Sequence, residues 1–358
     1  MRAAVMRAVG DPMVVRDDLA LRAVGAGEVR VRLRASGVCH SDLSILNGTL
    51  GARTLPAVLG HEGAGEIAEV GPGVGGLAPG DHVILSWVPP CGRCALCLGG
   101  QPHLCTSGRP SGPPTIRGAD GEDVHLGIGG GTFAEETIVP AIAAIPIPSD
   151  VPYEIAALVG CGVMTGVGAA LNTAAVRPGS SVVVIGCGGV GVNVVQGARA
   201  AGAATILAVD RVPGKRATAE TFGATDACAD TDLGDAVERL TGGAGFDYAF
   251  EVVGRSETIR QAWDATRRGG TTVVVGAGSA RDTVSFTAAE LFATGRTLLG
   301  CLYGSADVRT DFARVLRMWR AGRLDLEPLV SATIALDGVN DALAAMGNGD
   351  VVRSVIRY

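Results

Sequence analysis

The chain has 358 residues, of which 47% are hydrophobic and 18% charged, so it can bury a large core, and its length favours two domains. The formal net charge of -6 argues against the broad cationic surface that nucleic acids or anionic lipids require, so we expect neither partner. The N-terminus lacks the pattern of a signal peptide, and apolar runs such as VVVIGCGGVG are short and interrupted by glycine. We therefore expect a cytoplasmic protein without a membrane-spanning segment.

The first part of the chain, residues 1–157, is predicted to be a β-rich domain with many loops. Short runs of strand-like residues are separated by clusters of glycine and proline, namely EVRVRLRAS, GAGEIAEVG, DHVILSW and ETIV. Between the third and fourth of these runs, residues 108–123 are expected to form one long polar loop.

From residue 158 to residue 300 the pattern changes to strands that alternate with helices. The strand and helix pairs include SVVVIG with GVNVVQGARAAG, TILAVD with GKRATAETFG, and FDYAFEVVG with ETIRQAWDATRRGG, followed by the strand TTVVVGAG. Such strands, rich in valine and isoleucine, indicate a parallel sheet covered on both faces, and the fold class is therefore α/β. Residues 301–358, with the amphipathic helix DFARVLRMWRAG and the strand SVIRY, are expected to return to the first domain.

Residues 186–191, GCGGVG, match the dinucleotide-binding pattern G-x-G-x-x-G after a predicted strand and at the start of a helix. Gly186 would permit the turn, Gly188 would let the backbone approach a pyrophosphate, and Gly191 would allow close helix packing. Asp210, at the end of the next strand, would accept hydrogen bonds from the ribose of NAD and repel the 2'-phosphate of NADP. The neighbouring Arg211 would partly offset that repulsion. A simple tight turn is the alternative, which the strand and helix context weakens.

Four cysteines lie within CGRCALCLGGQPHLC: Cys91, Cys94, Cys97 and Cys105. Four thiolates at this spacing fit a closed tetrahedral zinc with no position for substrate, which predicts a structural site. An iron–sulfur cluster is the alternative, but the ferredoxin pattern places its fourth cysteine after three residues and before proline. A DNA-binding zinc finger would need basic surroundings, which this segment lacks.

A second set of metal ligands is scattered along the chain: Cys39, His61 and Cys161. Two thiolates and an imidazole are ligands that a catalytic zinc uses when it keeps its fourth position open. Each residue alone has an ordinary alternative, because free cysteines are commonly buried as small hydrophobic groups. Three such residues together with a dinucleotide site make the metal interpretation the stronger one.

The chain resembles the zinc-dependent alcohol dehydrogenases of the medium-chain dehydrogenase/reductase superfamily over essentially its full length. The motifs that carry the resemblance are GVCHSD, GHEGAGEIAEVGPGV, PGDHV, the four-cysteine segment, LVGCGVMTGVGAALNTA, VIGCGGVG, AVD, EVVGR, TGRTLLG and VVRSVIRY. The pattern is most similar to the branch of thiol-dependent (glutathione or mycothiol) formaldehyde dehydrogenases. The resemblance implies a GroES-like catalytic domain, a Rossmann domain that binds NAD, and two zinc ions per subunit, one catalytic and one structural.

By this resemblance Cys39, His61 and Cys161 hold the catalytic zinc, with Glu62 behind it and Asp42 orienting the imidazole ring. Ser41 would take the alcohol proton, and Ser44 stands where the liver-type branch has a relay histidine. The residues that would contact the cofactor are His40, Thr165, Gly186, Gly188, Gly189, Val190, Gly191, Asp210, Arg211, Lys215, Arg255 and Arg353.

The substrate positions implied by the resemblance are Trp87, Phe133, Ala277, Leu302 and Arg109. Arg109 falls where glutathione-dependent enzymes have an arginine, yet their acidic loop is replaced here by NGTLGARTLP. The substrate therefore stays open between a primary or aromatic alcohol and the adduct of formaldehyde with glutathione or mycothiol. A polyol substrate is less favoured, because polyol dehydrogenases of this superfamily commonly have glutamate at Cys161.

The non-enzyme alternative is a regulatory or binding member of the superfamily without zinc, but such members lose the ligands that this chain keeps. The expected partners are a small alcohol or aldehyde and a second copy of the chain. The resemblance implies a homodimer, with a homotetramer as the alternative, formed through the edge strand at residues 296–303.

Overall fold

The computed structural model describes residues 1–51, 54–108, 114–348 and 352–358. The chain forms two compact units. The first contains residues Met1–Gly162, Asp307–Arg314 and Leu326–Tyr358, and the second contains Val163–Ala306 and Val315–Asp325. The expected boundaries at residues 157 and 301 are each placed a few residues too early, and the second half of α10 (Val308–Arg320) belongs to the second unit, not the first.

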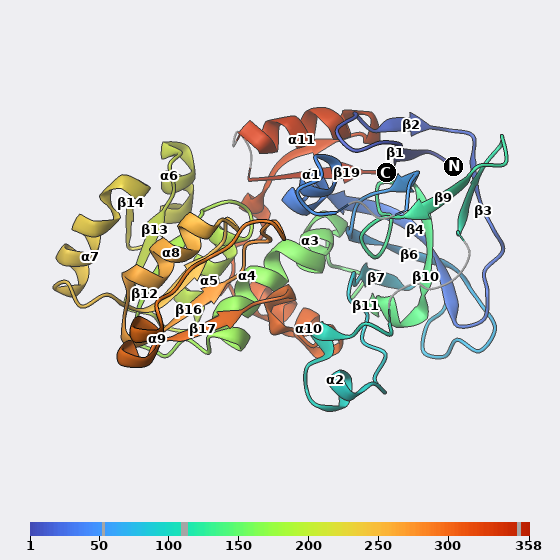
Figure 1. Cartoon of the computed structure of the whole chain (residues 1–358). Helices are drawn as coiled ribbons and strands as arrows, with labels where there is room; N and C mark the ends of the chain where they lie inside the picture. The colour runs from blue at the N-terminus through green and yellow to red at the C-terminus, as the bar shows by residue number, and fades with distance from the viewer. Residues whose placement is uncertain (52–53, 109–113, 349–351) are drawn as a thin grey trace. The chain divides into compact units, whose positions relative to one another are not determined.

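The first unit is built mainly from strands, as the sequence predicts (Figure 1). One sheet has the strand order β2-β1-β5-β9-β8-β3, and another has the order β11-β7-β6-β4-β19-β18, with β10 also paired to β4. The strands are β1 (Ala3–Met6), β2 (Val14–Arg16), β3 (Leu19–Leu21), β4 (Glu28–Gly37), β5 (Ala57–Val58), β6 (Glu62–Val70), β7 (His82–Leu85), β8 (Ile116–Gly118), β9 (Asp123–Leu126), β10 (Glu136–Pro140), β11 (Ala144–Pro146), β18 (Val330–Ile334) and β19 (Arg353–Arg357). The four predicted runs correspond to β4, β6, β7 and β10.

The helices that lie wholly in the first unit are short. They are α1 (His40–Leu46), α2 (Ala95–Leu98), α3 (Tyr153–Leu158) and α11 (Val339–Asn348). α11 packs near α1 and β19, and α3 packs against β4 and β6. The helices therefore cover strands that carry candidate site residues.

The prediction of one polar loop over residues 108–123 is wrong for its second half. β8 pairs antiparallel with β9, with Ile116 opposite Val124, and both side chains are buried. The polar residues between them hide the hairpin in the sequence, because each strand is too short to show a clear alternation. Residues 109–113 lie outside the described part.

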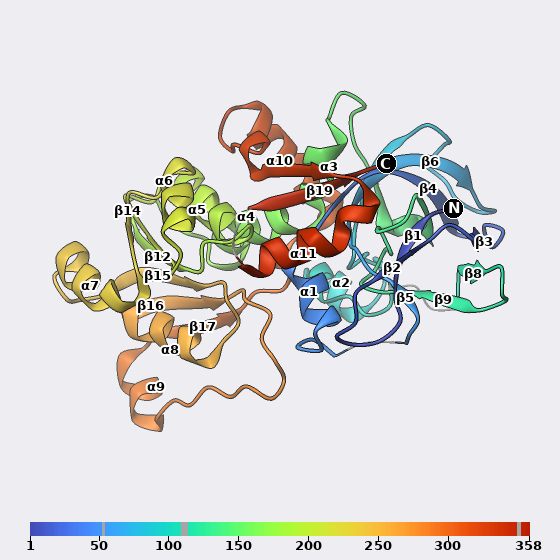
Figure 2. The same ribbon diagram turned by 90° about the horizontal axis from the view of Figure 1, so that it is seen from above.

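The second unit contains the predicted parallel sheet, with the order β14-β13-β12-β15-β16-β17 (Figure 2). Its strands are β12 (Ser181–Ile185), β13 (Thr205–Val209), β14 (Asp226–Cys228), β15 (Phe246–Glu251), β16 (Thr266–Val274) and β17 (Thr297–Gly300). Its helices include α5 (Gly191–Ala200), α6 (Pro213–Thr221), α7 (Leu233–Thr241), α8 (Ser256–Ala265) and α9 (Ala288–Thr294). The strand order reverses at β12, and ligands of such sheets bind at the carboxyl end of this switch point.

One helical segment contradicts the expectation that all apolar runs are short. Residues 155–176 carry no charge, and Tyr153–Thr173 forms successive α and π turns, including α4 (Met164–Gly168). By length and composition this helix could cross a membrane, but 89% of its most apolar window is buried inside the structure. Such burial is also found in core helices, so this feature is weak evidence for a membrane span.

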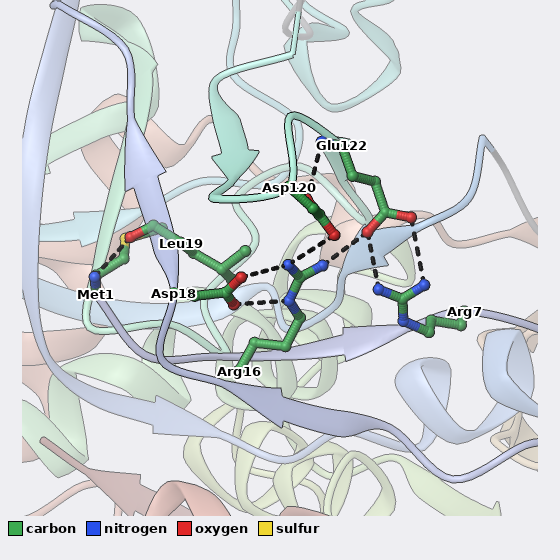
Figure 3. A network of polar contacts seen from close by, with 7 residues as sticks. All are labelled: Met1, Arg7, Arg16, Asp18, Leu19, Asp120 and Glu122. Carbon is green, nitrogen blue, oxygen red and sulfur yellow. Dashed lines mark hydrogen bonds and ion pairs between the residues drawn. The ribbon is translucent and has the colours of Figure 1, made fainter.

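A polar network ties β2 to the β8–β9 hairpin at the surface (Figure 3). The Arg16 guanidinium donates to Asp18 at 2.7 and 2.8 Å and to Glu122 at 2.7 Å, and it lies 3.3 Å from Asp120. The Arg16 side chain is only 10% exposed. Glu122 also forms an ion pair with Arg7, at 2.8 Å. These hydrogen bonds from Arg16 hold the pKa of Asp18 at about 2.

We predict that Arg16→Met lowers the free energy of unfolding by about 1–2 kcal/mol, because three carboxylates lose a shared donor. Urea unfolding at pH 7 measures this. The matched control is Arg117→Met, whose partner Asp123 and own side chain are 47% and 67% exposed, and which should cost less than about 0.5 kcal/mol.

The same network gives a pH dependence. Because the folded pKa of Asp18 lies below the unfolded value near 4, its contribution is present above that value and is lost as the pH falls toward 2. The stability difference between the parent and Arg16→Met should therefore shrink as the pH falls from about 5 to 3. A constant difference over that range would contradict this assignment.

Candidate active site

Three candidate ligands meet in the first unit because two strands are paired in a fixed register. β4 runs antiparallel to β6, with Gly37 opposite Glu62. Cys39 follows β4 and caps α1, while His61 immediately precedes β6. Cys161 comes from the π turn Val159–Val163. The ligand atoms of Cys39, His61, Glu62 and Cys161 all lie within 4.8 Å of one another.

Asp42 orients the imidazole of His61. Asp42 is fully buried, and its Oδ1 lies 3.2 Å from Nδ1 of His61 while accepting the backbone N–H of Gly60 at 3.0 Å. Its Oδ2 accepts the backbone N–H of Cys39 at 3.2 Å. A proton on Nδ1 that is donated to Asp42 leaves Nε2 of His61 free to bind a metal. The structure thus brings together the ligand and the orienting carboxylate that the sequence predicts.

Glu62 and Arg353 form a buried ion pair that sequence reasoning missed. Nη2 of Arg353 lies 3.2 Å from Oε1 of Glu62, and the two side chains are 4% and 0% exposed. Oε1 also accepts the N–H of Gly162 at 3.1 Å. Two glycines leave space for this pair. A Cβ on Gly37 would lie 2.1 Å from Oε2 of Glu62, and a Cβ on Gly162 would lie 1.8 Å from Nη2 of Arg353. The expected contact of Arg353 with the cofactor stays a prediction.

The electrostatics of this cluster follow from its burial. Burial raises the pKa of Glu62, whereas the positive charge of Arg353, 3.2 Å away, opposes this shift and favours the carboxylate. A hydrogen bond from Cys161, together with the charges of Arg353 and His61, holds the pKa of Cys39 well below its usual value despite burial. Cys39 therefore favours the thiolate, which is the form that binds metal. Two sulfurs and one imidazole nitrogen fit a zinc with one open position.

The four-cysteine site has the dimensions of a tetrahedral metal centre. All four Sγ atoms lie within 4.8 Å of one another, with Cys91 to Cys97 at 4.0 Å and Cys94 to Cys105 at 3.9 Å. Zinc bonds of about 2.3 Å in a tetrahedron place sulfurs about 3.8 Å apart. Backbone N–H groups of Arg93 and Cys94 lower the pKa of Cys91 to about 6, which favours its thiolate. The donor set therefore fits a closed structural zinc.

The residues expected to move a proton lie beside the metal ligands. Ser41 Oγ is 3.8 Å from Cys39 Sγ. Ser44 is buried, and its Oγ lies 3.3 Å from Nδ1 of the exposed His40. Where the liver-type relay would have a histidine side chain, this chain therefore has a serine paired with the histidine one helical turn earlier.

The glycines of the motif in the second unit differ in their backbone conformation and in the space around them. Gly186 has a φ of +96°, a conformation that favours glycine. A Cβ on Gly191 would lie 1.9 Å from the carbonyl oxygen of Gly186, whereas a Cβ on Gly188 would have no described atom within 4 Å. The backbone is thus open at Gly188 and closely packed at Gly191. Asp210 accepts the N–H of Cys187 at 2.9 Å, which fixes its carboxylate beside the motif.

The other expected cofactor residues lie on separate elements of the second unit. Gly189 and Val190 directly precede α5, and Lys215 lies on α6. Two arginines are exposed: Arg211 follows β13, and Arg255 directly precedes α8. Thr165 is buried on α4, and its Oγ1 has no hydrogen-bond partner among the residues that the structure describes.

Sequence reasoning missed Arg216. Its Nη1 donates to the carbonyl oxygens of Asp210 and Arg211 at 2.7 and 3.2 Å. The only signal was its position directly after Lys215.

The expected substrate residues are divided between the two units. Trp87 lies beside the metal ligands, because its ring meets that of His61 edge to face at 6.0 Å. Phe133 is fully buried in the core, its ring lies close to Gly60, and its backbone pairs with Leu59, so its expected place in the substrate pocket stays a prediction. Ala277 and Leu302 belong to the second unit. Arg109 lies outside the described residues, as does Ala52 of the replaced acidic loop.

A β-rich unit with two cysteine-based metal sites, followed by a dinucleotide-type parallel sheet, defines the class of zinc-binding dehydrogenases. Residues 25–149 match the family of the alcohol dehydrogenase GroES-like domain, and residues 189–320 match the zinc-binding dehydrogenase family. The chain belongs to the zinc-dependent alcohol dehydrogenases of the medium-chain dehydrogenase/reductase superfamily, and it is similar to their glutathione-dependent branch.

Three relatives show how far the similarity extends. S-(hydroxymethyl)glutathione dehydrogenase of Paracoccus denitrificans is 37% identical over 100% of this chain and 99% of the relative. A zinc-binding alcohol dehydrogenase domain protein of Burkholderia ambifaria has a TM-score of 0.93 at 38% identity, covering 99% and 98% of the two chains. Benzyl alcohol dehydrogenase of Acinetobacter calcoaceticus has a TM-score of 0.91 at 32% identity, with the same coverage. The protein is therefore an enzyme of the zinc alcohol dehydrogenase type.

We predict that Asp42→Asn weakens zinc binding at the site of Cys39, His61 and Cys161 by about 10–100-fold, because the amide is a poorer acceptor for the imidazole N–H. Chelator competition on the zinc-loaded protein measures this. Zinc held by the four-cysteine site serves as the internal control, and equal weakening at both sites would contradict the orienting role.

Proposed function

We propose that the protein transfers a hydride between a primary alcohol, or the adduct of formaldehyde with a thiol, and NAD, giving the aldehyde or the thioester. The observation that carries this proposal is the buried meeting of Cys39, His61 and Cys161, with Asp42 behind the imidazole. Three protein ligands of this kind are typical of catalytic zinc, which keeps one position for substrate.

The chemistry divides between the metal and the side chains around it. Cys39, His61 and Cys161 would hold the zinc, which as a Lewis acid lowers the pKa of a bound alcohol toward neutrality. Ser41, next to Cys39, accepts the alcohol proton, and the Ser44 and His40 pair offers a further acceptor toward solvent. Asp42 keeps the imidazole from turning. Trp87 covers the neighbouring wall and excludes water there.

NAD is the proposed cofactor, which accepts the hydride. Gly186, Gly188 and Gly191 form the expected backbone turn before α5, with room beside Gly188 for a pyrophosphate. The carboxylate of Asp210 lies at the carboxyl end of β13, where it favours ribose hydroxyls over a phosphate. Thr165 supplies an unpartnered hydroxyl on α4.

Two substrate classes have support. The name of the Paracoccus denitrificans relative favours a hydroxymethyl thiol adduct, with glutathione or mycothiol as the thiol. The structural similarity to benzyl alcohol dehydrogenase favours an aromatic primary alcohol. Leu50 stands where the thiol-dependent pattern expects an acid, which supports the aromatic alcohol.

We further propose a homodimer in the cytoplasm, with a homotetramer as the alternative. β17 is an edge strand of the described sheet, and Leu298 on it is 42% exposed. On α9 the apolar Leu291 and Phe292 are 47% and 90% exposed, and a second copy would cover them. None of the nine cysteines forms a disulfide in the described residues, which supports a reducing compartment.

The cofactor assignment gives a prediction. Asp210→Ser should reduce the preference for NAD over NADP by at least tenfold, because the carboxylate that repels the 2'-phosphate is removed while Arg211 remains. The ratio of kcat/KM values for the two cofactors measures this. Glu220→Ser, an exposed carboxylate farther along α6, is the control and should leave the ratio unchanged. An unchanged ratio in Asp210→Ser would contradict the assignment.

The substrate is decided by one set of assays. Purified enzyme with NAD is tested on benzyl alcohol and on formaldehyde, the latter with and without glutathione or mycothiol. We expect NADH formation with benzyl alcohol, and a dependence of formaldehyde oxidation on one thiol would identify the adduct class. Lack of NADH in every assay, with two zinc ions present per chain, would contradict the proposal.

A further inference from the structure

Four side chains form a hydrogen-bonded cluster on the sheet face where α3 packs: Arg34, Glu66, His82 and Tyr153. Arg34 donates two hydrogen bonds to Glu66, at 3.0 and 3.1 Å. The Tyr153 hydroxyl donates to Glu66 Oε1 at 2.9 Å and lies 2.8 Å from Nε2 of His82. The rings of Tyr153 and His82 also stack, with centroids 4.7 Å apart. The first residue of α3 is thus bound directly to β6 and β7, and through Glu66 to Arg34 of β4.

The other end of this helical segment is bound to the same strand. Glu62 accepts the N–H of Gly162 at 3.1 Å. Glu62 and Glu66 are four residues apart on β6, so their side chains point to one face of the sheet, about 13 Å apart along the strand. Nine helical steps from Tyr153 to Gly162 also cover about 13 Å. The helix therefore runs beside β6 with one glutamate holding each end.

Cys161 lies next to the second anchor. Cys39 and His61 come from segments that β4 and β6 place together, whereas Cys161 reaches them only through the helical segment. Gly160 lets this turn pack closely on the sheet, because a Cβ there would be 3.3 Å from Ile84 Cγ2. Buried apolar side chains such as Ile155 and Leu158 hold the segment against the sheet. The hydrogen bonds to Glu62 and Glu66 add directional contacts that fix its position along the strand.

We propose that Tyr153 is a positioning residue for the metal ligand Cys161. Its hydroxyl, held by Glu66 and His82, fixes the helical segment along β6 and so sets the distance of Cys161 from Cys39 and His61. This inference rests on the catalytic zinc proposed above. It assigns a role to Tyr153, which lies eight residues before Cys161 in the chain and whose hydrogen-bond partners are Glu66 and His82.

The test is Tyr153→Phe, which removes the hydroxyl and keeps the stacked ring. Zinc release from the fully loaded protein is followed with a colorimetric chelator, and the phase that disappears in Cys161→Ala identifies the active-site metal. We expect this phase to be at least threefold faster in Tyr153→Phe, while release from the four cysteines is unchanged. Cobalt placed in the active site should show a shifted visible absorption spectrum, because its sulfur ligands have moved.

Tyr248→Phe is the matched control, because it removes a hydroxyl from a partly buried tyrosine on β15 in the other unit. This variant should release both zinc ions at the parent rate. A parent-like rate and cobalt spectrum in Tyr153→Phe would overturn the proposal. An equal acceleration of both release phases would also overturn it, because that result marks general loosening of the fold.

A second variant decides the matter if Tyr153→Phe does not fold. His82→Phe keeps the ring stack and removes one partner of the Tyr153 hydroxyl, so it should accelerate the active-site phase in the same direction by a smaller factor. An unchanged rate would overturn the proposal. The parent protein separates this inference from the proposed function: a single zinc ion per chain would refute the catalytic zinc, whereas two zinc ions with no effect of these variants would refute the role of Tyr153 alone.

Discussion

The antiparallel register of β4 with β6 and β19 is the constraint on which the metal site depends. Gly37, at the end of β4, lies opposite Glu62 of β6 on one side and opposite Val355 of β19 on the other. This pairing brings together Cys39, His61 and Arg353, which come from three distant parts of the chain, at the ends of three neighbouring strands. A slip of one residue in either pairing would turn Glu62 or Arg353 to the opposite face of the sheet. The site therefore forms only in this register.

A buried ion pair at these strand ends requires space for two side chains and hydrogen-bond partners for both charges. Glu62 and Arg353 are almost completely buried, and a charge buried alone would cost several kcal/mol. Each therefore has further partners, because Glu62 accepts an N–H of the helical segment and Arg353 donates to the carbonyl oxygen of Val38 at 3.3 Å. The same glutamate that neutralises the arginine thus also holds the turn of Cys161. Glycine at positions 37 and 162 is required by this arrangement, since any side chain would occupy the space of the charged groups.

The sequence predicts those features that have a local pattern. The glycine motif and the four cysteines each lie within a short segment, and each strand of the parallel sheet is a local apolar run. The scattered ligands Cys39, His61 and Cys161 were candidates because of their donor atoms, and the resemblance to a known family assigned them to one zinc. Features formed by pairing across the chain were missed, including the Glu62 and Arg353 pair and the β8–β9 hairpin, because no local period marks them. The domain boundary was placed early because the helical segment from Tyr153 continues across it without a change in composition.

The two metal sites differ in what holds their ligands in place. Cys91, Cys94 and Cys97 lie in one short loop whose own backbone N–H groups point at the sulfurs, at 3.4 Å from Cys94 to Cys91 and 3.5 Å from Cys97 to Cys94. Such a loop needs little beyond itself to bind a metal. The ligands at Cys39, His61 and Cys161 meet only after two strands have paired and a helix has docked on them. Metal affinity at this second site therefore depends on how the strands and the helix of the first unit pack. A small change in the position of the helix changes the position of Cys161, the ligand that it carries.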